Sequence, residues 1–239
     1  MSARVAAGPL RVLGLRGIRL FDGIDAFSLE EIARQCRWRG FKRKERVISR
    51  RATDRDVYLV IAGAVRVTAH SPQGRGIIFR DISAGELFGE LSALDQRARS
   101  ADVIATTDAV LASMSPETFQ GVLTQYPGVR QRLFRNLAAL VRELSDRLLE
   151  LSTLDVEHRV AVELLLRVRA AGVTRNASRL LQTPTHRELA DRVGTSREQV
   201  TRTLLGFSRR GLIVRDRRRV LLVPDVAALE KLAGERARP

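Results

Sequence analysis

The fold of the chain is indicated first by the stretch Thr185–Gly211, THRELADRVGTSREQVTRTLLGFSRRG. It contains two capping boxes ten residues apart, Thr185-x-x-Glu188 and Thr195-x-x-Glu198, and each marks the start of a helix. Gly194 ends the first helix. The apolar residues are spaced to form the inner faces of both helices: Leu189, Ala190, Val193, Val200, Leu204 and Phe207. The stretch therefore predicts a helix-turn-helix.

The residues after this motif, LIVRDRRRVLLV (212–223), predict two strands around a basic turn, the wing of a winged helix. An arginine fork fits guanine O6 and N7, and a glutamate accepts from cytosine N4, so the second helix can read G·C pairs. Alternatively, Glu198 only caps the helix and Arg202 only contacts a phosphate. The expected DNA-binding residues are Thr185, Thr195, Ser196, Arg197, Glu198, Thr201, Arg202, Arg217 and Arg218.

The charge distribution agrees with this interpretation. The chain of 239 residues has a formal net charge of +15, and residues 175–219 alone carry twelve arginines against four acidic residues, a net of +8. Such a cluster is typical of nucleic-acid binding, although a solvated basic face has the same composition. No apolar run is long enough to span a membrane, and the single cysteine, Cys36, allows no internal disulfide. We therefore expect a cytoplasmic protein with no membrane partner.

A long helix is predicted from Pro127 to about Leu154. Its apolar residues follow a heptad pattern that predicts a homodimer interface, formed by Phe134, Leu137, Val141, Leu144, Leu148 and Leu151. A second apolar line, Leu133 and Leu140, lies on another face and could dock on the preceding domain. The alternative is a helix buried within a monomer.

Upstream of this helix, short apolar runs and turn signals from about Phe41 to Met114 predict an antiparallel barrel or jelly roll. A short helix is expected at Phe27–Cys36, capped by Ser28. The predicted fold class is α+β. Its parts are a loosely ordered basic extension (1–18), a β jelly-roll domain (19–126), a dimerisation helix (127–154) and a winged helix-turn-helix domain (155–239).

The stretch FGELSALDQRARSAD (88–102) interrupts the strands with a Gly-Glu pair and an Arg-Ser pair. Together with the domain order, it resembles the CRP/FNR family of regulators, closest to their cyclic-AMP-responsive branch, over Leu20–Leu232. The resemblance implies a cyclic-nucleotide site in which a glutamate accepts from the ribose 2′-hydroxyl and an arginine pairs with the phosphate. The implied ligand-binding residues are Gly89, Glu90, Leu91, Arg99, Ser100, Leu144 and Ser145.

This resemblance also implies double-stranded DNA and RNA polymerase as partners, and a near-palindromic operator with TGTGA-like half-sites. The effector would be cyclic AMP or cyclic GMP, with no metal. Leu144 stands where the cyclic-AMP receptor pattern has threonine, which leaves the preferred base open and keeps cyclic di-GMP as an alternative. Taken alone, Glu90 and Arg99 could be an ordinary ion pair at a barrel rim.

Other classes of function also have to be weighed. An iron–sulfur sensor needs several cysteine ligands where the chain has one, and a haem sensor needs a well-placed ligand where it has His70, His158 and His186. Constitutive DNA binding, with no effector, is a third alternative. No set of nucleophile, base and orienting residue points to an enzyme.

Overall fold

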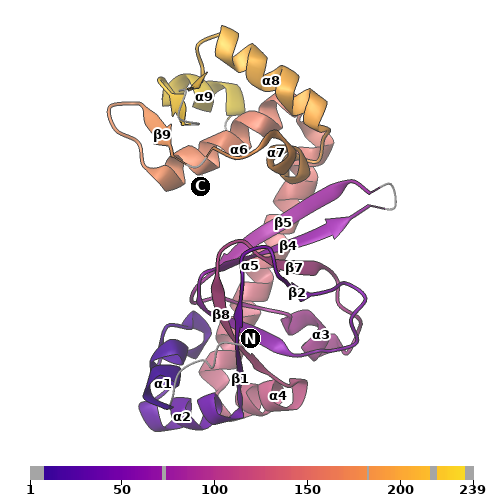
Figure 1. The fold of residues 1–239 in the computed structure, drawn as a ribbon, viewed down its shortest axis with the longest axis vertical. Coiled ribbons are helices and arrows are strands. Elements are labelled where there is room, and N and C mark those ends of the chain that lie inside the picture. Colours follow the sequence, from indigo (N-terminus) through magenta and orange to yellow (C-terminus); the bar gives the residue numbers. More distant parts are fainter. Residues whose placement is uncertain (1–7, 72–73, 182, 216–219, 235–239) are drawn as a thin grey trace. The chain divides into compact units, whose positions relative to one another are not determined.

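The computed structural model of the protein describes residues 8–71, 74–181, 183–215 and 220–234. The chain divides into two compact units between Leu140 and Val141 (Figure 1). This division falls inside the long helix α5 (Pro127–Thr153), whereas the sequence suggested a boundary after Leu154. The helix itself matches its predicted bounds to within one residue.

Residues 8–18 are more ordered than the sequence suggested, whereas residues 1–7 of the expected extension lie outside the described residues. Residues expected to be loosely ordered form α1 (Gly8–Arg16), followed by a short 3-10 turn, η1 (Arg19–Phe21). Leu15 and Ile18 are fully buried in the core of the first unit. Sequence periodicity missed this helix because its apolar residues do not form a regular stripe, and tertiary burial holds it in place.

The next helix, α2 (Ala26–Gln35), begins one residue earlier than expected. Its capping residue is Asp25 rather than Ser28: the Asp25 carboxylate accepts from the Ser28 backbone N–H at 3.0 Å and from the Ser28 hydroxyl at 2.7 Å. A carboxylate one turn upstream therefore takes the capping role, and Ser28 becomes its donor.

Two antiparallel sheets form the β-domain and confirm the predicted β architecture. The first has strand order β1-β8-β3-β6, with bounds Arg37–Phe41, Ala109–Met114, Val57–Ala62 and Leu87–Phe88. The second has order β2-β7-β4-β5, with bounds Arg46–Ile48, Asp102–Ala105, Ala64–His70 and Gly76–Ser83. Buried residues of both sheets share one apolar core, formed by Phe41, Ile48, Val60, Val65, Ile82, Val103 and Leu111.

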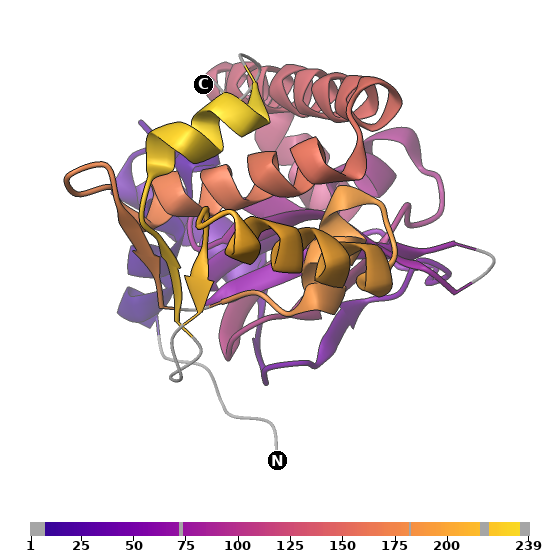
Figure 2. The same ribbon diagram turned by 90° about the horizontal axis from the view of Figure 1, so that it is seen from above.

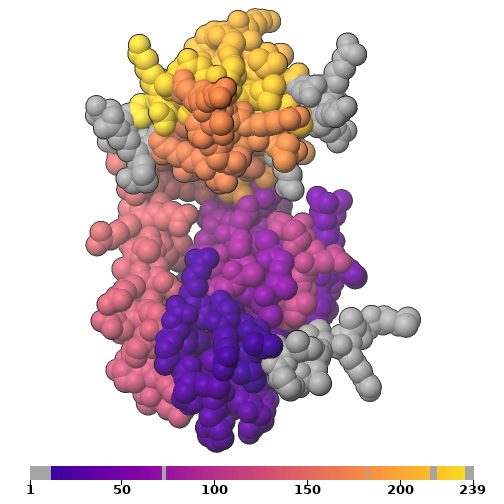
Figure 3. Space-filling view, turned by 90° about the vertical axis from the view of Figure 1, so that its left-hand side faces the viewer, coloured from indigo at the N-terminus to yellow at the C-terminus, as the bar shows by residue number. Residues whose placement is uncertain are grey.

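The helices of the first unit share a second apolar core with β3 and β8. After α3 (Glu90–Asp95) and β8, Ser115 caps α4 (Pro116–Gln125), which has proline in its first turn. The first half of α5 buries Leu133 in the core that α1 and α2 also line. Figure 3 shows α1 and α2 in indigo beside the pink start of α5. The predicted docking of Leu133 is thus confirmed.

The second unit is built around α6 (Val156–Ala171). In Figure 2, α6 lies between α9 (Val226–Ala233) and α8 (Arg197–Arg209). A small antiparallel sheet has the order β10-β11-β9, with bounds Val214–Arg215, Leu221–Val223 and Ser178–Leu180. The first two strands are the predicted wing strands. β9 was not predicted, because three residues carry too short a pattern.

Candidate functional site

The turn between β6 and α3 is built around Gly89, which has a left-handed backbone with φ of +85°. A Cβ at this position would lie 2.8 Å from Nη1 of Arg99 and 2.9 Å from the carbonyl oxygen of Asp56. Only glycine therefore allows the Arg99 guanidinium to lie directly on this turn. The structure thus brings Gly89 and Arg99 together, ten residues apart in the sequence.

Arg99 is held firmly although it is charged and only 4% exposed. Its guanidinium donates to the carbonyl oxygens of Gly89 at 3.0 Å and Asp56 at 2.8 Å. It also donates to the Asp54 carboxylate at 2.8 Å. Its Nε is buried and has no hydrogen-bond partner among the described residues. The site therefore presents an oriented cation whose hydrogen-bonding capacity is not fully used.

Asp54 is a site residue that the sequence did not reveal. It lies between β2 and β3, 45 positions from Arg99, and its side chain is 43% exposed. Asp54 follows Thr53 in a pair that is typical of a turn, and such a pair carries no information about the distant arginine. The exposed carboxylate already places an anionic oxygen against the guanidinium, so this position suits an anion.

Glu90 begins α3 and is buried. Burial raises the pKa of its carboxyl, while its own backbone N–H and the guanidinium groups of Arg80 and Arg99 oppose that rise. Glu90 and Arg99 are both described residues, and no ion pair joins them. The alternative of an ordinary Glu90–Arg99 rim pair therefore does not match the geometry. Leu91 and Ser100, also expected at the site, are both exposed.

The other expected ligand contacts, Leu144 and Ser145, belong to the second unit, on an exposed part of α5. The Ser145 hydroxyl donates to the Val141 carbonyl oxygen at 2.9 Å. The structure thus clusters Gly89, Glu90 and Arg99 within the first unit. The base-contacting role of Leu144 and Ser145 stays a prediction.

The predicted heptad seam of α5 is largely solvent-exposed in the single chain. Leu137 is partly buried against the core of the first unit. The other five residues are between 43% and 66% exposed: Phe134, Val141, Leu144, Leu148 and Leu151. A continuous apolar stripe of this kind is a typical interaction surface.

The helix-turn-helix is formed by α7 (His186–Val193) and α8. Thr185 caps α7 as predicted, because its hydroxyl oxygen accepts from the Glu188 backbone N–H at 3.1 Å. Gly194 ends that helix with a left-handed backbone. The cap of α8 differs from the prediction: it is Ser196, which accepts from the Gln199 N–H at 3.2 Å.

Thr195 does not cap α8 because it is buried in the turn. Its backbone N–H donates to the Ala190 carbonyl oxygen at 3.0 Å, and its hydroxyl bonds the Gln199 side chain. The predicted capping box is therefore displaced by one residue. Thr195 and Ser196 are both residue types that commonly cap helices, and the burial of Thr195 leaves Ser196 as the cap.

The face of α8 that should meet DNA carries Arg197, Glu198 and Arg202. All three side chains are exposed. The pKa of Glu198 is lowered by hydrogen bonds to its own backbone N–H and to the Ser196 hydroxyl. Glu198 thus contributes to the helix start and stays accessible to solvent. Two further expected contacts, Arg217 and Arg218, lie outside the described residues.

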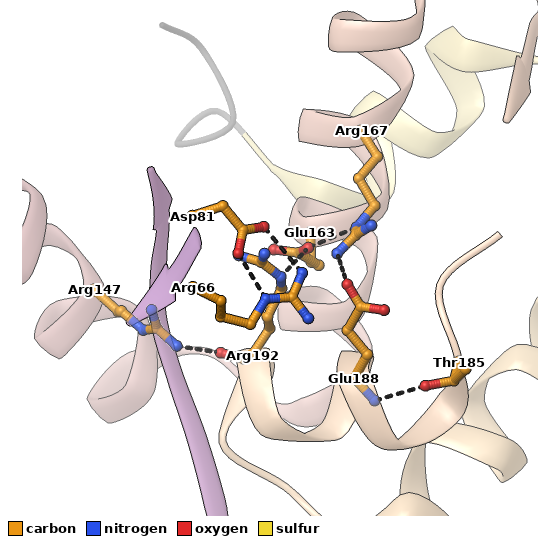
Figure 4. A network of polar contacts seen from close by, with 8 residues as sticks. All are labelled: Arg66, Asp81, Arg147, Glu163, Arg167, Thr185, Glu188 and Arg192. Carbon is orange, nitrogen blue, oxygen red and sulfur yellow. Dashed lines mark hydrogen bonds and ion pairs between the residues drawn. The ribbon is translucent and has the colours of Figure 1, made fainter. Parts of the chain in front are cut away.

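A network of polar contacts holds α7 within the second unit (Figure 4). Arg147 of α5 donates to the carbonyl oxygen of Arg192, and Arg159 of α6 donates to that of Val193 at 2.9 Å. Both acceptors lie at the end of α7, where helical carbonyls lack partners within the helix. No sequence pattern indicated this arrangement, because the donors come from two other helices.

The same network binds the start of α7 to α6. Arg167 bridges two carboxylates, donating to Glu163 at 2.7 Å and to Glu188 at 3.3 Å. Figure 4 shows this guanidinium between the two acids. Both ends of α7 are therefore fixed by charged side chains of neighbouring helices.

Across the described residues, no group of three or more His, Cys, Asp or Glu side chains is placed to hold a metal ion. Burial raises the pKa of the Cys36 thiol to about 12. A search of the same residues found no helix that is both long and apolar enough to cross a membrane.

Comparisons with known proteins cover both units. The family model of the cyclic nucleotide-binding domain matches residues 38–126, and the family model of the Crp-like helix-turn-helix domain matches residues 158–232. The transcriptional regulator LdrP of Thermus thermophilus is 34% identical over 194 residues, 81% of this chain and 95% of LdrP. A CRP-like cAMP-activated global transcriptional regulator of Mycobacterium tuberculosis is 28% identical over 85% of this chain and 91% of its own.

Among solved structures, a CRP-family transcriptional regulator from Thermus thermophilus superimposes with a TM-score of 0.66. It is 31% identical in sequence, and the match covers 82% of this chain and 97% of that one. The likeness therefore extends over both units.

Proposed function

Because the chain belongs to the CRP/FNR family of transcriptional regulators, we propose that it is a homodimer gated by a cyclic nucleotide, with cyclic AMP the first candidate and cyclic GMP the second. Members of this family regulate transcription and are not enzymes. The proposal places the effector at Gly89, Glu90 and Arg99, and the operator at α8.

The observation that carries the ligand proposal is the state of Arg99. It is buried, oriented by two carbonyl oxygens, and paired with an exposed carboxylate from Asp54. A phosphodiester oxygen could replace that carboxylate and keep the charge-assisted hydrogen bond. Glu90, buried one residue after the glycine turn, offers carboxyl oxygens to a ribose hydroxyl.

The exposed seam of α5 supports the homodimer. A second copy of the chain would cover the same stripe with an identical one, which is how heptad-patterned helices pair. In such a dimer two α8 helices would enter successive major grooves about 34 Å apart and read a near-palindrome with TGTGA-like half-sites. Arg197, Glu198 and Arg202 are the expected base-reading side chains.

Helix α5 is the element on which gating would act. It begins in the unit that contains Arg99 and ends in the unit that contains α8. A nucleotide that binds one position of this helix better than another would shift the population toward that position. Both α8 helices of the dimer would then move together.

Isothermal titration calorimetry with cyclic AMP, cyclic GMP and cyclic di-GMP tests the effector directly. We expect cyclic AMP or cyclic GMP to bind and Arg99→Met to abolish binding, with thermal unfolding as the check that the variant folds. Tight binding of cyclic di-GMP alone would identify cyclic di-GMP as the effector in place of cyclic AMP or cyclic GMP. No binding of any of the three would favour constitutive DNA binding. A coloured purified protein would support the haem alternative.

Fluorescence anisotropy with a TGTGA-type palindromic duplex tests the operator. The duplex should bind more tightly with nucleotide than without it, and Glu198→Ala should reduce discrimination at the contacted C·G pair. Unchanged discrimination would limit Glu198 to capping. We also propose a cytoplasmic location and RNA polymerase as a partner, which follow from the regulatory role alone.

A further inference from the structure

A chain of hydrogen bonds links the wing to the second helix of the helix-turn-helix. Arg215 of β10 lies 2.5 Å from Nε2 of His186, the first residue of α7. Nδ1 of the same ring lies 2.6 Å from the Thr201 hydroxyl of α8. That hydroxyl in turn lies 2.9 Å from the Arg197 carbonyl oxygen. One imidazole therefore connects three elements of the DNA-binding unit.

The donors and acceptors along this chain can be assigned. A guanidinium only donates, so Nε2 of His186 has to accept from Arg215. A neutral imidazole then carries its proton on Nδ1 and donates it to the Thr201 oxygen. The Thr201 hydroxyl proton goes to the Arg197 carbonyl oxygen, which cannot donate. Every contact is then a hydrogen bond.

The electrostatic surroundings favour this neutral imidazole. Partial burial lowers the pKa of His186, and the positive charges of Arg215 and Arg197 lower it further. Among the described residues, these two arginines are the charged groups that act on the ring from β10 and α8. The link is therefore complete near neutral pH. When the pH falls and Nε2 gains a proton, two donors and two positive charges face each other at the Arg215 contact, so the ring should move away from Arg215 and out of its position beside Thr201.

The assignment limits what Thr201 can offer to DNA. Its oxygen already donates one hydrogen bond and accepts another, so it has one free lone pair and no free proton. Toward a base it can only accept or make an apolar contact through its methyl group. In the major groove, adenine and cytosine present amino groups and thymine presents a methyl, whereas guanine presents acceptors.

We propose that His186 is a positioning residue that fixes the Thr201 hydroxyl as an acceptor, so that Thr201 selects adenine, cytosine or thymine edges against guanine. This inference rests on the proposed DNA-reading role of α8. It assigns His186 and Arg215 a function in specificity rather than in general phosphate binding.

The test begins with selection of duplexes from a randomised pool by the wild-type protein, with and without cyclic AMP. The specificity ratio is then the affinity for the selected duplex divided by that for a scrambled duplex, measured by fluorescence anisotropy. His186→Phe should lower this ratio about twofold to tenfold, the usual contribution of one hydrogen bond. His186→Gln, which keeps one donor and one acceptor, should restore most of it.

The pH profile separates this role from a simple charge effect. In the wild type the ratio should fall by a similar factor as the pH is lowered through the pKa of His186, which the nitrogen chemical shifts of the ring locate, and it should stay flat in His186→Gln. A histidine that only binds phosphate would tighten all duplexes on protonation and leave the ratio unchanged. His158→Phe, a change at the start of α6, is the matched control and should behave like the wild type.

A double-mutant cycle completes the design. Thr201→Val removes the hydroxyl and keeps the shape, so adding it to His186→Phe should cause no further loss of the ratio. A wild-type ratio that stays constant while His186 gains its proton, or a His186→Phe ratio equal to that of the wild type, would overturn the inference. A wild-type protein that enriches no duplex would instead refute the proposed function. In that case the nitrogen chemical shifts of the His186 ring, measured by NMR without DNA, would still show which ring nitrogen carries the proton.

Discussion

Replacing Asp54 with asparagine should raise the affinity of the candidate site for a phosphodiester. The carboxylate accepts from Arg99 at 2.8 Å, and the two side chains are 43% and 2% exposed, respectively. A pair with one buried and one partly exposed partner contributes about 1–2 kcal/mol, between a surface pair and a buried charge-assisted hydrogen bond. A phosphate that binds Arg99 has to displace this carboxylate. Binding should therefore tighten by about fivefold to thirtyfold.

Asparagine has nearly the same size as aspartate, so the loop before β3 should keep its shape. Calorimetry with cyclic AMP and cyclic GMP measures the effect, and Asp108→Asn is the matched control. That change removes the same charge from a carboxylate that pairs with Lys42 rather than with Arg99. Asp54→Asn should also lower the unfolding temperature without nucleotide, and nucleotide should restore it. Equal or weaker binding by a folded Asp54→Asn protein would refute the view that Asp54 competes with the ligand.

Three further changes test the seam, the glycine turn and a helix cap. Leu148→Glu should turn a dimer into a monomer in sedimentation experiments, because a side chain 66% exposed in one chain would lose about 1.5–3 kcal/mol of apolar burial in each copy. Ala139→Glu, which is exposed but outside the seam, should not dissociate the dimer. Gly89→Ala should lower the free energy of unfolding in urea by about 1–3 kcal/mol, because it strains a left-handed backbone and clashes with Arg99. Ser196→Ala should lower it by about 1 kcal/mol, and an unchanged midpoint would argue against its capping role.

Patterns repeated along the chain predicted much of the fold. The alternating strands, the heptads of α5 and the spacing of buried residues in α7 and α8 each combine several positions into one signal. Features that depend on a single residue, such as the identity of a helix cap, were harder to predict. Thr195 and Ser196 are adjacent hydroxyl residues, and only the burial of Thr195 identifies Ser196 as the cap.

The candidate site was predicted in part, for the same reason. Gly89, Glu90 and Arg99 lie in one short stretch, so their proximity is visible in the sequence. The Asp54 carboxylate and the Asp56 carbonyl oxygen contact Arg99 from the connection between β2 and β3, and no local sequence pattern indicates that contact. The His186 link likewise joins residues 15 and 29 positions apart through side-chain geometry alone.

The support of α7 by Arg147 has a practical consequence for protein engineering. Recombining this DNA-reading module with a different sensor needs a fusion point, and the natural choice would be the short connection after Thr153. A junction there would leave behind Arg147, which donates to the Arg192 carbonyl oxygen near the end of α7. A chimaera that joins near Val141 instead would retain the arginine together with the second half of α5, and it should give the better-folded hybrid.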